Sequence, residues 1–252
     1  IIMETFGRSH RESLENVEAF LDKHAASKQE EVAVLDGAEE TRKLYKLHIE
    51  YYYDFENLRS AAINFTAASA IIPRNFVVAM VSQFDAFVGK MIRALFTIRP
   101  ELLNSSEKNI SFSNLMQFKS LDDAREFVLE KEVEAVLREN HAEHFDWFER
   151  KLGMELRKGL DIWPIFIELT ERRNLFVHAD GIISSQYLAT CSKHKCLIPK
   201  SCGIGTRLDV NPDYFQQAYY CLFEIATKLS QVLWRKLVGS VIRFSRFAPD
   251  RV

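Results

Sequence analysis

Arg173, Asn174 and His178 are the residues whose types and spacing could carry out a reaction. Cleavage of RNA by its own 2′-hydroxyl needs a base to remove that proton, an acid to protonate the leaving 5′-oxygen, and a cation to stabilise the crowded phosphorus centre. Histidine, with an ordinary pKa of about 6.5, can act as base or acid near neutral pH. Arginine can hold a phosphate through paired N–H donors. Together these side chains could cleave RNA without a metal ion.

These residues occur within Glu171–Gly181, which the sequence favours as the end of a helix. In a helix, Asn174 and His178 are four positions apart and share a face, while Arg173 lies about 100° round the axis from Asn174. One turn would then present an imidazole, an amide and a permanent cation. In the alternative interpretation, Arg173 is a surface cation and His178 is a residue favoured at a helix C-terminus by the helix dipole.

The order of arginine, polar residue, three variable residues and histidine resembles the signature of the HEPN family. Further segments are similar to one bacterial branch of that family: Asp180–Ile183 with Tyr187, Met80–Phe87, Arg99–Leu103 and Trp234–Leu237. The resemblance covers roughly residues 40 to 238. It implies an all-α, HEPN-like helical bundle, here with an N-terminal helical extension.

The resemblance also implies a function, a metal-independent endoribonuclease acting as a toxin or effector in bacterial anti-phage defence or in a toxin–antitoxin system. RNA is the implied substrate, and an antitoxin or defence-system protein is a further implied partner. No cofactor is expected. Two alternatives stay open: a catalytically silent HEPN module that senses a nucleotide or RNA for a partner protein, and a purely structural helical adaptor.

A homodimer is expected for two reasons. One chain offers a single motif histidine, whereas the reaction is best served by two, and ribonucleases of the resembled family usually pair two motifs across a dimer. In addition, the apolar stripe from Val77 to Phe96 is broader than one packing contact needs. Two copies would bring both copies of Arg173 and His178 into one cleft.

The segment after the motif is basic. Residues 181 to 208 contain no acidic side chain, and residues 181 to 252 hold ten Lys or Arg against four Asp or Glu, whereas residues 101 to 150 hold twelve acidic and six basic side chains. A phosphate backbone approaching the motif would therefore meet positive charge first. The predicted RNA-binding residues are Lys193, Lys195, Lys200 and Arg207. The alternative is a basic loop that is simply solvated.

The composition of the 252 residues, 47% hydrophobic and 27% charged, is that of an ordinary soluble globular protein. Nine glycines and six prolines are few, which favours long helices over many short strands. No apolar run reaches the roughly 20 residues needed to cross a bilayer, and the first residues lack the pattern of a signal peptide. A cytoplasmic protein with no membrane partner is expected.

No metal site is predicted. Cys191, His194, Cys196 and Cys202 could gather zinc, but they lack the paired Cys-x2-Cys spacing that is typical of zinc sites. We expect reduced thiols on a loop, with Cys221 inside a helix core. His141 and His144 are three apart on a helix, but no third ligand lies nearby in the sequence, which favours a solvated pair.

Hydrophobic periodicity and helix-end signals predict the elements that position these residues. The expected layout is an N-terminal helical extension over residues 1–37, a HEPN-like domain over 38–238 and a C-terminal tail over 239–252. Pro73 should end one helix, and Pro164 and Gly181 should mark the two ends of the motif helix. Residues 104–120 should be mostly loop, and Trp234 should lie in the core. Helices are expected over residues 13–26, 38–70, 75–97, 121–140, 141–152, 162–178 and 211–237.

Overall fold

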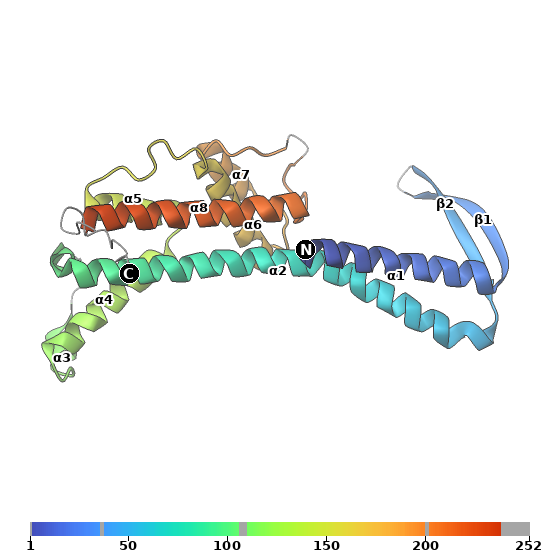
Figure 1. Ribbon diagram of the computed structural model, residues 1–252, viewed down its shortest axis with the longest axis horizontal. Coiled ribbons are helices and arrows are strands. Elements are labelled where there is room, and N and C mark those ends of the chain that lie inside the picture. The colour runs from blue at the N-terminus through green and yellow to red at the C-terminus, as the bar shows by residue number, and fades with distance from the viewer. Residues whose placement is uncertain (1, 36–37, 106–109, 200–201, 238–252) are drawn as a thin grey trace, which may run out of the picture. The chain divides into compact units, whose positions relative to one another are not determined.

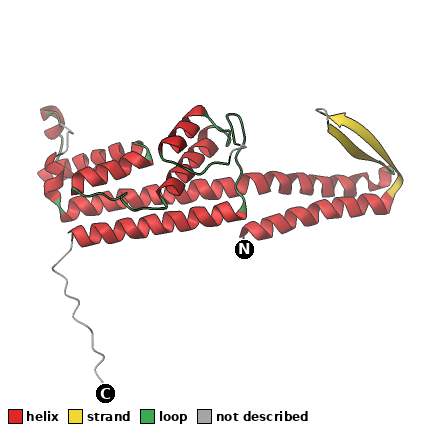
Figure 2. Cartoon of the chain, turned by 90° about the horizontal axis from the view of Figure 1, so that it is seen from above, coloured by secondary structure: helices red, strands yellow, loops and turns green. Residues whose placement is uncertain are grey.

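The computed structural model describes residues 2–35, 38–105, 110–199 and 202–237. This part of the chain is mostly helical, which confirms the all-α expectation, with one two-stranded sheet in addition (Figures 1 and 2). Its contacts divide the chain into two units, an N-terminal unit (1–75 and 209–212) and a C-terminal unit (76–208 and 213–252). The expected tail over 239–252 lies outside the described residues.

The N-terminal unit holds a long helix, a β-hairpin and the start of a second helix. Its elements are α1 (Ile2–His24), β1 (Ala25–Leu35), β2 (Ala38–Leu47), the 3-10 turn η1 (Ile49–Tyr51) and the first part of α2 (Tyr52–Ile98). The strands pair antiparallel. Aromatic contacts tie the end of α1 to the start of α2, since the ring of Tyr51 lies 4.4 Å from that of His24 and 6.4 Å from that of Phe20.

The hairpin corrects the sequence prediction. Residues 38–47, expected in a helix, form strand β2, and α2 begins only at Tyr52. The predicted break at Pro73 is also wrong, because α2 continues through it to Ile98. An interior proline costs a helix about 3 kcal/mol. The nearby Val77 and Val81 are fully buried, and burying one valine contributes about 1.5–3 kcal/mol, so packing of the following turns offsets that cost.

The C-terminal unit is a helical assembly built on the rest of α2. Its further elements are the 3-10 turn η2 (Pro100–Ser105) and the helices α3 (Phe112–Leu115), α4 (Leu121–Arg138), α5 (His141–Leu152), α6 (Trp163–His178), α7 (Ser185–Lys193) and α8 (Pro212–Leu237). Helix α8 runs alongside the part of α2 that follows residue 76 (Figures 1 and 2). The unit's core contains Val81, Phe84, Ile92, Phe96, Phe148, Phe166, Leu169, Ile225 and Leu233.

Side-chain caps define where several helices begin. Ser120 accepts a hydrogen bond from the backbone N–H of Asp123, and Asn140 accepts one from that of Glu143, so α4 and α5 are separate helices. Ser184 likewise accepts from Tyr187 and starts α7. The predicted loop after the motif therefore contains a helix, and the sequence signal for it was this serine cap.

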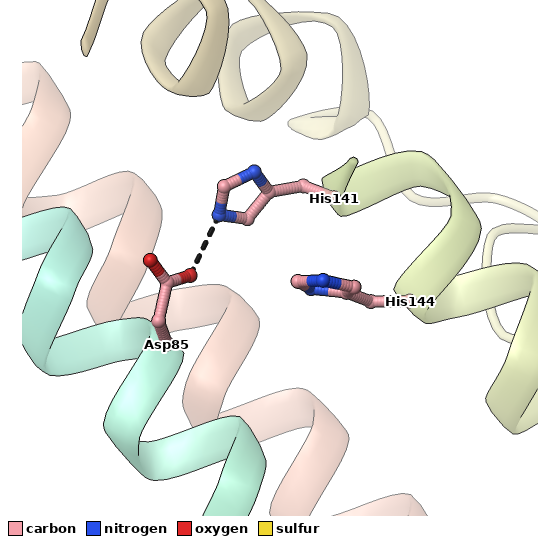
Figure 3. A group of neighbouring side chains, drawn as sticks. All are labelled: Asp85, His141 and His144. Atoms are coloured by element: carbon pink, nitrogen blue, oxygen red, sulfur yellow. Dashed lines mark hydrogen bonds and ion pairs between the residues drawn. The ribbon is translucent and has the colours of Figure 1, made fainter. Parts of the chain in front are cut away.

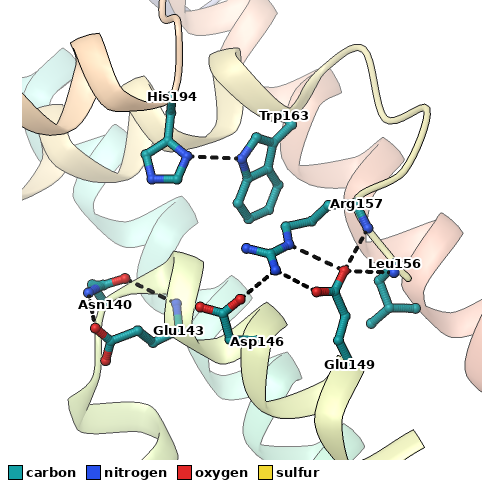
Figure 4. A network of polar contacts seen from close by, with 8 residues as sticks. All are labelled: Asn140, Glu143, Asp146, Glu149, Leu156, Arg157, Trp163 and His194. Carbon is teal, nitrogen blue, oxygen red and sulfur yellow. Dashed lines mark hydrogen bonds and ion pairs between the residues drawn. The ribbon is translucent and has the colours of Figure 1, made fainter. Parts of the chain in front are cut away.

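A polar network fixes the connection between α5 and α6 (Figure 4). Glu149 Oε1 accepts hydrogen bonds from the backbone N–H groups of Leu156 and Arg157, at 2.8 and 3.0 Å, and from the Arg157 side chain. Asp146 also binds that guanidinium, whose carbon lies 5.6 Å from the ring centre of Trp163 at the start of α6. The network sets the position at which α6 begins.

One further expectation is wrong. Trp234, expected in the core, is 56% exposed. Among the described residues, Ile49–Ile98 is long and apolar enough to cross a membrane by length and composition alone, and the expectation of no spanning segment stays a prediction. That test is also passed by core helices of water-soluble proteins.

Candidate functional site

The motif helix α6 ends in a tight turn that requires glycine. The backbone N–H groups of Ala179 and Gly181 both donate to the carbonyl of Leu175, at 2.8 and 3.0 Å. Gly181 has φ 79°, and a Cβ there would lie 3.0 Å from the Leu208 carbonyl oxygen and 3.3 Å from the Phe176 ring. The glycine of the motif segment therefore closes α6 against the segment that returns at Leu208.

The structure places the three predicted catalytic residues in different surroundings on α6. His178 lies exposed in the last turn, one turn after the half-buried Asn174, so the shared face is as predicted. Arg173 is half-buried and its Nη2 donates to Asp85 Oδ2 at 2.5 Å. Within the described residues no hydrogen bond or ion pair joins Arg173 to His178. The imidazole is thus open to solvent, whereas the guanidinium is held in place.

Asp85 on α2 is a residue that the sequence analysis did not assign to the site. Its Oδ1 lies 2.7 Å from Nε2 of His141, so the carboxylate serves Arg173 and His141 at once. Burial by itself would raise the pKa of Asp85, but the hydrogen bond from His141 and the charges of His141 and Arg173 outweigh it and lower that pKa. Asp85 is therefore ionised at neutral pH.

The interpretation of His141 and His144 as a solvated pair without a third ligand is wrong. Both rings are buried, and both extend from α5 toward Asp85 on α2 (Figure 3). No spacing rule could reveal this third residue, because Asp85 lies 56 positions before His141 on another helix. Among the described residues, these three form the group of side chains that could hold a metal ion, with potential ligand atoms all within 4.8 Å of one another.

His144 is the unusual member of this cluster. It is only 2% exposed, and neither ring nitrogen has a hydrogen-bond partner. Leaving a buried polar atom unpaired costs about 1–3 kcal/mol. Burial, together with the neighbouring His141, lowers the pKa of His144 to about 4, so its imidazole is neutral at physiological pH.

Burial also favours the neutral form of a half-buried carboxyl, that of Glu171. Burial raises the pKa of Glu171, one helical turn before Asn174, although the nearby charges of His141 and Arg173 lower it. Together with Asp85 and the two histidines, this makes the surface between α2, α5 and the middle of α6 rich in ionisable groups. Perturbed pKa values of this kind cluster at functional sites in proteins.

Glu168 is a second polar centre, and it is structural. It is buried and accepts hydrogen bonds from Arg172 at 2.7 Å, Tyr187 at 2.6 Å and Tyr214 at 2.9 Å. Glu168 and Arg172 are four positions apart on α6, the spacing of an ordinary helix ion pair, and here this pair belongs to a network that joins α6, α7 and α8. Tyr187, part of the segment that resembles the HEPN family, thus has a clear structural role. Burial, with the neighbouring Glu168 carboxylate, raises the pKa of this tyrosine well above its ordinary value.

The predicted basic surface is weaker than expected. Lys193 and Lys195 are exposed, Lys195 with φ 57°, while Lys200 lies outside the described residues. Arg207 is exposed but forms an ion pair with Asp180 at the end of the motif turn. The RNA-binding role of Arg207 stays a prediction, but the acid that precedes the basic segment folds back onto this cation.

The four cysteines are free thiols. Cys221 is buried in α8, as predicted, but Cys191 is also buried and lies on α7 instead of a loop. Cys196 and Cys202 pack partly buried against the same small core as Cys191. The zinc alternative is not supported, because the grouped metal-ligand candidates in the described chain do not include these cysteines.

Comparison with family models, with curated proteins and with solved structures finds no match to this chain.

Proposed function

We propose that the chain is a metal-independent endoribonuclease whose reacting groups lie on the second half of α6. The observation that carries the proposal is the contrast within the motif. His178 is exposed and has no hydrogen-bond partner in the described structure, as a base or acid that meets its substrate must be, while Arg173 on the same helix is held by an ionised carboxylate.

In this proposal His178 transfers the proton of the 2′-hydroxyl or protonates the leaving 5′-oxygen, and Arg173 stabilises the charge that develops on phosphorus. Asp85 acts as a positioning residue for Arg173, because it fixes the guanidinium before substrate binds. Asn174, on the face of His178, orients the imidazole or binds a phosphate oxygen. Lys193 and Lys195 attract the RNA backbone.

Two copies of the chain supply the second histidine. The apolar stripe of α2 from Val77 to Phe96 does not support a dimer, because its residues are buried within the chain itself. These include Val81, Phe84, Val88, Ile92 and Leu95. Support comes instead from the exposed apolar residues next to the motif, Val177 and Ile182, which a second copy would cover. The implied role as a toxin or defence effector, with an antitoxin or defence protein as partner, rests on the resemblance to the HEPN family.

The decisive experiment combines the purified chain with total cellular RNA in the presence of EDTA and maps the product ends. Attack by the 2′-hydroxyl leaves 2′,3′-cyclic phosphate or 3′-phosphate ends and 5′-hydroxyl ends. His178→Ala should remove the cleavage, and His48→Ala, which changes an exposed histidine far along the chain, should not. A strict requirement for Mg²⁺ would contradict the mechanism.

A second candidate is the silent HEPN module. The observation in its favour is that the guanidinium groups of both Arg173 and Arg207 already have carboxylate partners within the chain. The same experiment separates the two functions. Binding of RNA by wild type and by His178→Ala with no cleavage by either would favour the silent module.

A further inference from the structure

The side chains of Asp85, His141 and His144 come together between α2 and α5. Asp85 Oδ1 and His141 Nε2 lie 2.7 Å apart, and His144 brings its ring beside them (Figure 3). Two phenylalanines pack beside His141, whose ring centre is 5.7 Å from that of Phe166 and 6.5 Å from that of Phe84. The two histidines are therefore buried, while Asp85 stays partly exposed.

From this geometry we propose that Asp85, His141 and His144 bind a divalent transition-metal cation, with Zn²⁺ as the representative ion. Two imidazoles and one carboxylate are a ligand set used for zinc, and imidazole favours Zn²⁺ and its neighbours over Mg²⁺ or Ca²⁺. In a tetrahedral site with bonds of about 2.0–2.1 Å, neighbouring ligand atoms lie about 3.3 Å apart. The observed separations of 2.7 Å to at most 4.8 Å come within a small side-chain movement of that value.

His144 gives the second, independent observation. It is almost completely buried, its two ring nitrogens have no partner, and its ring is directed at the Asp85–His141 pair. A metal ion would satisfy one of these nitrogens, and three protein ligands would leave the fourth position for water. The backbone carbonyls of Val136 and Glu139 lie close enough to raise its pKa, but neither stands at hydrogen-bonding distance and angle from a ring nitrogen.

Arg173 would support the metal from outside the ligand shell. It binds Oδ2 of Asp85, the oxygen that does not face His141, and so orients Oδ1 toward the cluster. Such outer partners fix the ligating carboxylate, and their loss typically weakens metal binding by about 10- to 100-fold. The bound cation would in turn hold Asp85 and Arg173 in place. The metal takes no part in the proposed cleavage.

The test is a binding measurement on the full chain without RNA. Protein stripped with a chelator and then dialysed is titrated with Zn²⁺ by calorimetry, and with Co²⁺ by absorption spectroscopy. We expect one equivalent per chain and a cobalt spectrum without thiolate absorption, which distinguishes this cluster from the cysteines. His144→Phe, which fills the space with an apolar ring, should weaken binding at least about 100-fold, and Arg173→Ala about tenfold.

His48→Ala is the matched control, because this histidine is exposed and belongs to the N-terminal unit; its affinity should equal that of wild type. Asp85→Asn, which keeps the shape of the side chain, should also lose binding and covers the case in which His144→Phe does not fold. The proposal is overturned if wild type binds less than one equivalent of Zn²⁺. It is also overturned if His144→Phe and Asp85→Asn both fold and bind Zn²⁺ as tightly as wild type does. These outcomes are separate from the RNA experiment, in which EDTA is present throughout.

Discussion

Asp85 and Arg173 form an ion pair across 88 positions of sequence, with Nη2 of the arginine 2.5 Å from Oδ2 of the aspartate. The pair joins α2 to the motif helix and belongs to both proposals. For the RNA reaction Asp85 fixes the cation, and for the metal site Arg173 fixes the ligand. Changes at either residue should therefore lower stability or activity more than changes at exposed surface ion pairs do.

Asp85→Asn should destabilise the chain by about 1–3 kcal/mol, because it removes one charge of a half-buried, hydrogen-bonded pair. Asp180→Asn is the matched change, since the Asp180–Arg207 pair is exposed and should contribute less than about 1 kcal/mol. Urea unfolding of both variants measures the difference. Equal effects would show that the Asp85 pair does not anchor α6.

Arg173→Lys should lose most of the RNA cleavage although it keeps the positive charge. The planar guanidinium of arginine can donate to Asp85 with one edge and to a phosphate with another. Lysine offers a single point charge on a flexible stem and cannot make both contacts in this way. The rate of cleavage at saturating RNA, compared with that of Lys195→Arg, measures the effect. Wild-type activity in Arg173→Lys would leave only a general electrostatic role for this residue.

Gly181→Ala should destabilise the end of α6 by more than about 1 kcal/mol and reduce cleavage with it. Alanine is strained at φ 79°, and its Cβ would meet the Leu208 carbonyl at 3.0 Å. The control is Gly203→Ala, where no atom lies within 4 Å of the added carbon and φ is not in the left-handed region. Thermal unfolding of both variants tests this, and similar midpoints would contradict the role of Gly181.

Glu149→Gln should lower stability at neutral pH by about 1–2 kcal/mol and have little effect in acid. Burial opposes ionisation of Glu149, but its hydrogen bonds from the Arg157 side chain and from the backbone of Arg157 and Leu156 outweigh burial and lower its pKa. The contribution is therefore present above the ordinary pKa of 4.5 and is lost as pH falls through the lowered value. Urea midpoints of wild type and variant, measured from pH 7 down to acid, should converge.

Mixing Arg173→Ala chains with His178→Ala chains should restore part of the cleavage if two copies form one composite site. One such cleft would then contain the intact Arg173 of one copy and the intact His178 of the other. Light scattering on the wild-type chain gives the mass in solution. A monomer that cleaves RNA at full rate would contradict the shared site.

Helices α4, α5 and α6 could be predicted from sequence because their signals are local. Apolar spacing marks their buried faces, and Asn140 or Pro164 marks where a helix begins. The hairpin of β1 and β2 was missed even though Asp36–Gly37, a dipeptide typical of two-residue hairpin loops, stands between the two strands in the sequence. Apolar spacing over residues 38–70 favours a helix there, and that signal conflicts with the turn dipeptide.

The polar clusters could be predicted only where their members lie within one helical turn. The pairing of Glu168 with Arg172 follows from a spacing of four, but their tyrosine partners come from α7 and α8. Asp85 and His141 meet only because α2 packs against α5, a tertiary contact that no spacing reveals. The exposure of His178 and the partial burial of Arg173 are likewise consequences of packing.

Arg172 and Arg173 are adjacent in sequence but point about 100° apart around α6. The first is held by Glu168 on the same helix and by the ring of Tyr214 on α8, and the second by Asp85 of α2. The Glu168–Arg172 pair lies within α6 and turns with it, but a twist of α6 about its own axis would break the Arg173–Asp85 pair and the hydrogen bonds from Tyr187 and Tyr214 to Glu168. These contacts with α2, α7 and α8 therefore fix the rotational setting of the helix. The face that carries Asn174 and His178 therefore keeps a set direction relative to α2, α7 and α8.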